Sequence, residues 1–348
     1  MKEGKHKIFV GVSGGVDSSV VAYLLKEQGH DVHGVFVKTW SPEWLPCTWV
    51  DEKRDAMRVC AALDIPFHFL DAEEAYKQGV AHYMIAEYKT GRTPNPDVLC
   101  NRIIKFGVLW GYVKAQGGDY IATGHYARTD GEHLMKGVDT SKDQSYFLWM
   151  LSRSELSHIL FPIGHLQKSE VRTIAEKAGL FTSEKKDSQG ICFLGDIDMR
   201  EFLAHYIEQK KGPVVDTMGN IIGEHDGIWF YTLGERHGFR LVTQSTDQKP
   251  YYVVEKKIEN NTLVVSHEST KKSDKETQTI TLRDTSWIES GVKSCDAQVR
   301  YHGELIPATI TDECTVELSY RGVVAEGQSL VLYKGETLIG GGVLDSIS

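Results

Sequence analysis

The sequence predicts an α/β protein with a doubly wound parallel sheet, a small mixed β domain and a C-terminal β-barrel. The chain has 348 residues, which exceeds the usual size of one compact domain. Strand-like and helix-like runs alternate over residues 1–200, and strand-helix alternation is typical of a parallel sheet covered by helices on both faces. Beyond that point short strand-like runs are separated by turn signals. We therefore expect domains at residues 1–200, 201–274 and 275–348.

The elements of the first domain follow from hydrophobic periodicity. Strands are expected at 7–12, 31–40, 67–70 and 120–125, and helices at 18–28, 51–63, 103–115 and 168–178. In the first helix Val20, Val21, Leu24 and Leu25 share one face, and Gly29 provides a stop signal.

The elements of the second half are shorter. A last helix is expected at 199–211, where Gly212 and Pro213 break it. Turn signals follow at 218–220, 248–250 and 260–261, and the polar stretch 271–278 is interpreted as a linker. The strand-like runs at 298–301, 307–311, 315–320, 329–333 and 338–344 predict a small closed barrel.

Composition narrows the class of protein. Hydrophobic residues make up 41% and charged residues 25% of the chain, as in soluble globular proteins. No apolar run approaches the roughly 18 to 20 residues that a membrane span needs, so we expect a cytoplasmic protein with no membrane partner. The net charge of −9 argues mildly against a nucleic-acid partner, because phosphate binding requires a local basic face.

The cysteines do not form a scaffold. The chain has six of them, widely spaced and with no C-x-x-C pair, so neither a disulfide framework nor a metal site is expected. In a reducing compartment such cysteines are mostly buried or reactive.

The strongest motif is Ser13-Gly14-Gly15-Val16-Asp17-Ser18-Ser19, between the first predicted strand and the first predicted helix. Glycines let the backbone approach a phosphate, and the N–H groups at a helix start bind its charge. The loop has no lysine, so it differs from loops that hold a transferring γ-phosphate, and it lacks the spacing of a dinucleotide site. The alternative is an ordinary glycine-rich strand-helix turn.

This loop resembles the pyrophosphate loop of the ATP pyrophosphatase (PP-loop) superfamily. Five further motifs resemble the bacterial tRNA-specific 2-thiouridylases: TPNPDVLCN at 93–101, ATGHYAR at 122–128, KDQSYFL at 142–148, DSQGICF at 187–193 and YTLGERHG at 231–238. The similarity runs through the whole chain, including GEHDG at 223–227 and VRY at 299–301.

The resemblance implies an enzyme, a tRNA-uridine 2-sulfurtransferase. In that family ATP, with Mg²⁺, adenylylates the 2-oxygen of the wobble uridine (U34), and a cysteine persulfide then delivers sulfur to the base. It further implies tRNA as the partner and a sulfur relay that begins with a cysteine desulfurase.

Three residues would carry the sulfur chemistry. A lone cysteine is usually a small buried hydrophobe. Cys100 follows the Pro94-Asn95-Pro96 segment close to an expected helix start, where a thiol gains nucleophilicity. By resemblance, Cys192 carries the persulfide, Cys100 is the second, nucleophilic cysteine that can form a disulfide with it, and Asp97 is the acid-base group. Asp97 could instead be a helix N-cap.

Other site residues carry over by motif. The ATP-binding set is Gly11, Val12, Ser13, Gly14, Gly15, Val16, Asp17, Ser18, Val37 and Gly124. Val37 stands where the family usually has methionine beside the adenine. The tRNA-binding set is Asn95, Pro96, Asp97, His125, Lys142, Asp143, Gln144, Arg300, Tyr301 and Gln328. For His125 the alternative is a structural histidine, and for Lys142 and Arg300 a solvated surface charge.

Three alternatives stay open at this point. Another adenylylating enzyme of the superfamily needs no matched Cys100 and Cys192. The same thiolation could use an iron–sulfur cluster held by these two cysteines and a third ligand. An RNA-binding barrel with a degenerate nucleotide fold would be no enzyme, but the intact phosphate loop argues against it.

Overall fold

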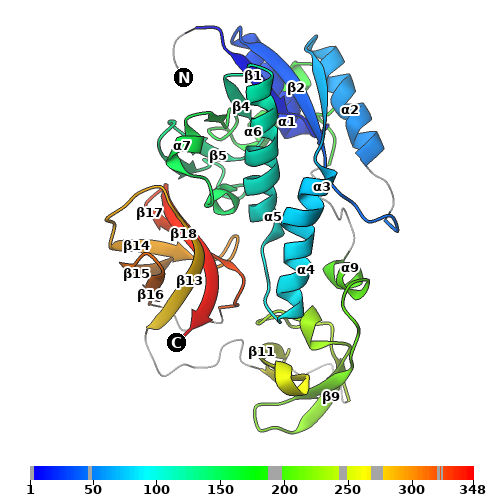
Figure 1. Ribbon diagram of the computed structural model, residues 1–348, viewed down its shortest axis with the longest axis vertical. Helices are drawn as coiled ribbons and strands as arrows, with labels where there is room; N and C mark the ends of the chain where they lie inside the picture. Colours follow the sequence, from blue (N-terminus) through cyan, green and yellow to red (C-terminus); the bar gives the residue numbers. More distant parts are fainter. Residues whose placement is uncertain are drawn as a thin grey trace.

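The computed structural model describes residues 4–45, 49–186, 198–242, 249–267, 277–319, 322 and 324–348. Within them lie three sheets, one for each region that the sequence predicts (Figure 1). A parallel sheet with helices forms the N-terminal part, a mixed sheet forms the middle part, and a closed antiparallel barrel forms the C-terminal part. The predicted fold class is confirmed.

The N-terminal sheet has the strand order β3-β2-β1-β4-β7, and all its pairings are parallel. Its strands are β1 (Lys7–Gly11), β2 (Asp31–Lys38), β3 (Phe67–Asp71), β4 (Tyr120–Ala122) and β7 (Ile159–Leu160). The N-terminal part also contains the helices α1 (Val16–Glu27), α2 (Trp49–Ala62), α3 (Glu73–Tyr76), the π-helix η1 (Lys77–Ala81), α4 (His82–Lys89), α7 (Arg153–Leu156) and α8 (Lys168–Lys177).

Alternation along β1 explains why helices cover both faces. Ile8 and Val10 pack into the cluster of α1, α2 and α8, whereas Phe9 packs into the cluster on the opposite face. All three side chains are fully buried, so neither face of this central strand can meet water.

One long helical stretch carries the predicted catalytic segment. It consists of α5 (Pro96–Leu99), the π-helix η2 (Cys100–Val108) and α6 (Leu109–Ala115). The predicted helix of 103–115 therefore began seven residues too late. Pro96 occupies the first helical turn, where its missing N–H costs nothing. Asn95 is the N-cap, and its side-chain oxygen accepts from Val98 N at 3.4 Å.

The middle part is a five-stranded mixed sheet in the order β10-β9-β8-β12-β11. Its elements are α9 (Met199–Ala204), β8 (Gly212–Val215), β9 (Ile221–His225), η4 (Ile228–Phe230), β10 (Arg240–Leu241), β11 (Tyr252–Lys257), η5 (Ile258–Asn260) and β12 (Thr262–Ser266). The predicted helix of 199–211 was too long: it ends at Ala204, and His205 stacks on Trp44 with ring centroids 3.7 Å apart.

The barrel is closed by the pairing of its first and last strands, β13 and β18. Its strands are β13 (Gln278–Trp287), β14 (Ser294–Gln298), β15 (Ile306–Asp312), β16 (Thr315–Leu318), β17 (Ser329–Lys334) and β18 (Thr337–Ile347). Gln278 thus belongs to a strand, although the sequence placed it in the linker, and residues 271–276 of that linker lie outside the described part.

A hairpin of the N-terminal part extends the barrel sheet, which the sequence did not predict. Strands β5 (Ala127–Thr129) and β6 (Leu134–Lys136) are followed by the 3-10 helix η3 (Ser145–Leu148). β6 pairs with β18 through Thr337–Met135 and Leu338–Leu134. The N-terminal part and the barrel therefore share backbone hydrogen bonds as well as side-chain contacts. In the described part of the chain, no helix is both long and apolar enough to cross a membrane.

Candidate functional site: the phosphate loop and the Asn95–Cys100 segment

The phosphate loop lies between the end of β1 and the start of α1. Gly14 has φ +73°, and a Cβ there would lie 2.8 Å from both Asp55 Cβ and Glu52 O, so only glycine lets the loop pack on α2. Gly15 is the N-cap of α1, and no side chain of the described residues caps that helix start. The backbone N–H groups of the first helical turn, Val16–Ser18, are therefore available to an anion, whereas the Gly15 N–H donates to Ser13 Oγ at 3.4 Å.

The other predicted ATP-binding residues surround this loop. Val12 and Val16 are buried in the core, so only their backbone can meet a ligand. Gly124 follows β4, and a Cβ on it would lie 3.0 Å from Asp17 Cβ. Gly11 and the half-buried Val37 stand at the carboxyl ends of β1 and β2, the edge where open parallel sheets bind ligands.

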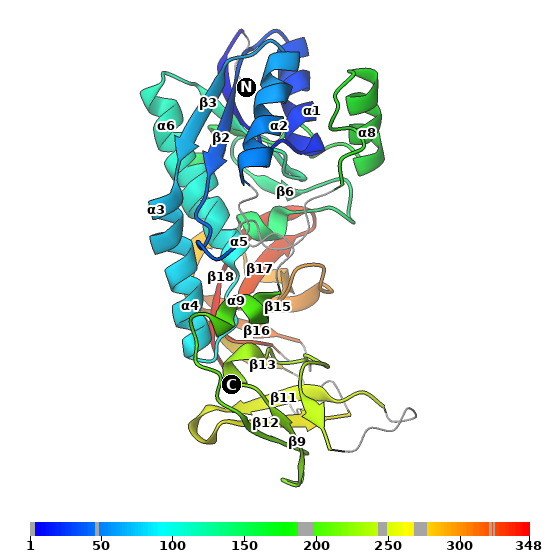
Figure 2. The ribbon, with the colours of Figure 1, turned by 90° about the vertical axis from the view of Figure 1, so that its right-hand side faces the viewer.

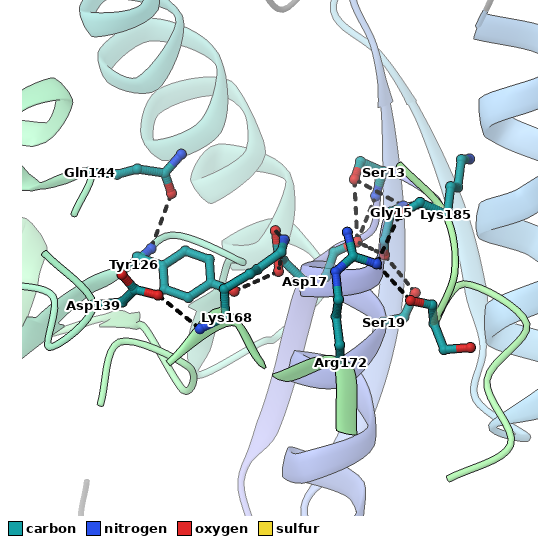
Figure 3. Close-up of polar contacts among 12 residues, drawn as sticks. Ser13, Gly15, Asp17, Ser19, Tyr126, Asp139, Gln144, Lys168, Arg172 and Lys185 are labelled. Atoms are coloured by element: carbon teal, nitrogen blue, oxygen red, sulfur yellow. Dashed lines mark hydrogen bonds and ion pairs between the residues drawn. The ribbon is translucent and has the colours of Figure 1, made fainter. Parts of the chain in front are cut away.

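Two lysines that sequence reasoning missed converge on the loop (Figure 3). Lys168, the first residue of α8, places Nζ 2.8 Å from both carboxylate oxygens of Asp17. Lys185 places Nζ 3.1 Å from Gly14 O and 2.7 Å from Asp55 Oδ2, and this ion pair lowers the pKa of Asp55. The cations that the loop sequence lacks are thus supplied from a distant part of the chain.

Tyr126 also contacts Asp17 of the phosphate loop. Its hydroxyl donates to Asp17 Oδ1 at 2.8 Å, and its backbone N–H donates to Gln144 Oε1 at 3.1 Å. The backbone N–H of Gln144 donates in turn to Tyr126 O at 2.9 Å. Figure 3 shows Gln144, Tyr126, Asp17 and Lys168 in this arrangement. Gln144, a predicted tRNA contact, thereby fixes the loop that carries Tyr126.

His125 is buried within a hydrogen-bonded network. Asn101 Nδ2 donates to Phe147 O at 3.0 Å, which turns Asn101 Oδ1 toward His125 Nε2 at 3.2 Å. Nε2 also lies 3.3 Å from Lys105 Nζ, and Nδ1 lies 2.7 Å from the Thr123 hydroxyl, so both ring nitrogens have buried partners. Burial, and then the charge of Lys105, hold the pKa of His125 well below its usual value.

The helix start at Pro96 changes the surroundings expected for Cys100. The Cys100 backbone N–H already belongs to the helix, bonding to Pro96 O and Asp97 O, so the field of the helix start acts on Asn95–Asp97. Asn95, rather than Asp97, is the N-cap. The Cys100 side chain is 2% exposed and lies in the core that α4 and η2 share with the middle sheet.

Two predicted tRNA-binding segments line one cavity of about 400 Å³. Asp143 lines it from the N-terminal part and Tyr301 from the barrel. Tyr301 packs on Phe147 with ring centroids 4.4 Å apart, and burial raises its pKa to about 12. Lys142 is half-buried beside this wall, and Arg300 is exposed next to Tyr301.

The remaining predicted residues are not all placed. Gln328 Nε2 donates to Thr93 O at 2.8 Å, close to the Asn95–Cys100 segment. Cys192 lies outside the described residues, as does Cys47. Cys60 and Cys295 are buried, and burial raises the pKa of each thiol to about 11. The described residues contain no group of three or more His, Cys, Asp or Glu side chains that could hold a metal ion.

The matches to known protein families divide the chain into the same three parts. Three family models match: "tRNA methyl transferase HUP domain" at 6–196, "tRNA methyl transferase PRC-barrel domain" at 200–267 and "Aminomethyltransferase beta-barrel domain" at 277–344. The chain is 43% identical to tRNA-specific 2-thiouridylase MnmA of Streptococcus thermophilus, over 98% of this chain and 95% of that protein. The chain belongs to the bacterial tRNA-specific 2-thiouridylase family. The Bacillus subtilis member is 42% identical over the same shares of the two chains.

Membership in this family of ATP pyrophosphatases implies that the chain uses ATP. Solved structures align more loosely. NMN synthetase from Francisella tularensis is 15% identical, with a TM-score of 0.35 over 53% of this chain and 67% of that one.

Proposed function

We propose that this protein catalyses ATP-dependent 2-thiolation of the wobble uridine of tRNA. The observation that carries the proposal is the 43% identity to a tRNA-specific 2-thiouridylase over 98% of the chain. The described structure agrees with that chemistry in two respects. The helix that follows the phosphate loop has no side-chain cap, and a second helix, capped by Asn95, carries Asp97 in its first turn and Cys100 directly after α5.

The first step would activate the base. The phosphates of ATP would lie on the N–H groups of Val16–Ser18, with the ammonium groups of Lys168 and Lys185 beside them. Mg²⁺ would accompany the nucleotide and reduce the charge of its phosphates. The uridine 2-oxygen would attack the α-phosphorus, and pyrophosphate would leave.

The second step would transfer sulfur. The terminal sulfur of a Cys192 persulfide would attack C2 of the activated base, AMP would leave, and Asp97 would take up the proton. The Cys100 thiolate would then attack Cys192 Sγ and release the sulfur on the base, leaving a Cys100–Cys192 disulfide. A two-electron reductant must reopen this disulfide before the next turnover.

The RNA would lie across the N-terminal part and the barrel. Asn95–Asp97 would meet the target base, which must leave its stack to reach the site. The cavity that Asp143 and Tyr301 line, with Lys142 and Arg300 beside it, supports a contact with the RNA at this junction. The persulfide on Cys192 would come from a relay that begins with a cysteine desulfurase, and the reaction would take place in the cytoplasm.

The names of the matching family models favour a second candidate, tRNA methyl transfer. The phosphate loop argues against it, because methyl transfer does not cleave ATP between the α and β phosphates. An amide-forming or other adenylylating enzyme would share that cleavage but would not need both cysteines. An iron–sulfur cluster on Cys100 and Cys192 would give the anaerobically purified protein visible absorbance, which the persulfide route does not require.

Cleavage of ATP tests the proposal. With unmodified tRNA and ATP labelled at the α or γ position, we expect AMP and pyrophosphate, whereas ADP and phosphate would show that the loop has been misinterpreted. Ser13→Ala or Asp17→Ala should abolish this tRNA-dependent cleavage and leave the fold intact. S-adenosylmethionine-dependent methylation of the tRNA would favour the second candidate.

A further inference from the structure

All three parts of the protein meet on Gly91–Thr93, the segment that connects α4 to Asn95 and α5. Figure 2 shows α4 beside the barrel strand β18 and above the middle sheet. Thr93 is 8% exposed, and it stands two residues before the side chain that caps α5. Contacts on this segment therefore act directly on the helix start that carries Asp97 and Cys100.

The barrel holds Thr93 by both of its backbone polar groups. Thr93 N donates to Glu326 O at 2.9 Å, and Thr93 O accepts from Gln328 Nε2 at 2.8 Å. Gly327, between these two partners, has φ +88°, and a Cβ on it would lie 2.9 Å from Thr93 N. Only glycine permits this approach, so the sequence of the barrel loop is adapted to the contact.

The barrel loop is itself fixed to β18. Gly327 N donates to Leu344 O and Leu344 N donates to Gln328 O, each at 2.8 Å. Next along the strand, Asp345 Oδ1 lies 3.0 Å from Arg92 Nη2. A displacement of the barrel would therefore be transmitted to Thr93 through short, hydrogen-bonded connections rather than through a long loop.

The middle part holds the same segment from the other side. The Thr232 and Thr93 hydroxyls lie 3.3 Å apart. Lys256 Nζ donates to Gly91 O and, at 2.9 Å, to Tyr231 O, and burial lowers the pKa of this lysine to about 8. The contacts of Thr232 with Thr93 and of Lys256 with Gly91 O join the middle part to the N-terminal part.

We propose that Gln328 is a positioning residue, which holds Thr93 and so sets the place of Asp97 and Cys100 when RNA binds to the barrel. The inference rests on the proposed function, because it concerns the rate of sulfur transfer to tRNA. A displacement of about 1 Å in a reacting geometry lowers a rate by up to roughly 100-fold. The contact thus links the RNA-binding barrel to the chemistry.

A substitution at Gln328 separates positioning from RNA contact. We expect Gln328→Ala to lower the rate of 2-thiouridine formation, at saturating ATP and tRNA, by roughly 10- to 100-fold. Gln328 is also one of the tRNA contacts predicted from the sequence, but its amide donates to Thr93 O in this structure. If positioning is its role, the dissociation constant of tRNA should stay within about twofold of the wild-type value. A weaker tRNA complex with an unchanged rate at saturation would overturn the proposal and would make Gln328 a direct tRNA contact.

A pair of glycines tests the same contact without removing any side chain. Gly327→Ala adds a methyl group against Thr93 N, whereas Gly335→Ala, in the turn between β17 and β18, adds one where nothing lies within 4 Å. Both residues have positive φ, +88° and +61°, so alanine strains the backbone at each position, and only at Gly327 does it also meet Thr93. Only Gly327→Ala should reproduce the loss of rate with unchanged tRNA affinity.

Hydrogen exchange gives a readout independent of activity. The Thr93 amide should exchange faster in Gly327→Ala than in Gly335→Ala, because its acceptor Glu326 O is displaced. Equal exchange in the two variants would overturn the proposal. If the wild type forms no 2-thiouridine, the proposed function fails, and this exchange comparison still decides whether the barrel holds Thr93.

Discussion

Asn101 Oδ1 lies 3.2 Å from His125 Nε2, and this hydrogen bond connects the helix of Cys100 to the loop behind the phosphate site. Asn101 is the residue after Cys100, and His125 follows Gly124, where an added Cβ would lie 3.0 Å from Asp17 Cβ and 3.1 Å from Ser18 N. The two halves of the proposed reaction, ATP cleavage and sulfur transfer, are therefore joined by one buried polar contact. Buried networks of this kind hold their members in a single arrangement.

The first prediction concerns His125. His125→Gln should lower the free energy of unfolding at pH 7 by about 1–3 kcal/mol, because the buried groups of Asn101 and Thr123 lose their partner. The folded-state pKa of His125 lies below its unfolded value of about 6.5, so the wild type loses stability as the pH falls below that value. His125→Gln has no titrating group at this position, so this part of the pH dependence of its stability is absent.

Urea denaturation at pH 7 and pH 5 checks this prediction. The loss of stability between the two pH values should be smaller in His125→Gln than in the wild type, and the exposed His165→Gln should behave as the wild type does. An equal loss in His125→Gln would show that His125 is protonated in the folded protein.

The second prediction concerns the lysines at the phosphate loop. Lys168→Ala should weaken binding of ATP and of pyrophosphate by roughly 10- to 100-fold, because a charge-assisted contact worth about 1.5–3 kcal/mol is lost. AMP should bind almost as it does to the wild type. Calorimetry measures all three ligands without turnover.

Neighbouring lysines provide matched controls. Lys177→Ala alters an exposed lysine of the same helix α8 and should leave all three affinities unchanged. Lys186→Ala serves in the same way for Lys185→Ala, since Lys186 is exposed and Lys185 contacts Gly14. Equal losses of affinity for AMP and ATP in Lys168→Ala would exclude a role at the β and γ phosphates.

The third prediction concerns RNA. Despite the net charge of −9, tRNA should bind with an affinity that falls steeply with salt. Arg300→Ala should weaken binding of all tRNAs alike and reduce the salt slope by about 1. The matched control is Lys293→Ala, an exposed lysine just before β14, the strand that Arg300 follows. Binding that is indifferent to salt would contradict a phosphate contact.

The fourth prediction separates the cysteines. Cys192→Ser should accept no labelled sulfur from a desulfurase, whereas Cys100→Ser should become labelled and then fail to turn over unless a reductant releases sulfide. Adenylylation should survive in both variants. After one turnover without reductant, the wild type should hold a Cys100–Cys192 disulfide, with the two Cα atoms within about 7 Å. Labelling of Cys192→Ser but not of Cys100→Ser would reverse the two roles.

Periodicity and loop chemistry in the sequence were enough to predict the parallel sheet, the closed barrel and the phosphate loop. These features depend on local patterns, such as the alternation of Ile8, Phe9 and Val10. The helix start at Pro96 was missed because its residues carry a cap signal but no apolar periodicity. The end of α9 was also missed: His205 is its C-cap and stacks on Trp44, a contact between distant residues that local periodicity does not reveal.

The residues that complete the site could not be found in the same way. Lys168 and Lys185 are ordinary charged residues in the sequence, and only the fold brings them to Asp17 and Gly14. The contact of Gln328 with Thr93 joins residues more than two hundred positions apart. Glycine at position 327 was the available signal, but its meaning depends on a partner that the sequence does not reveal.

Analysis of the tRNA product tests the central claim most directly. Unmodified tRNA is incubated with the protein, ATP and a sulfur source. The tRNA is then digested to nucleosides, which are separated and identified by mass spectrometry. We expect 2-thiouridine to form only when ATP is present, with one AMP released for each thiolated base. A tRNA whose uridines stay unmodified while AMP accumulates, or that gains a methyl group instead of sulfur, would contradict the account.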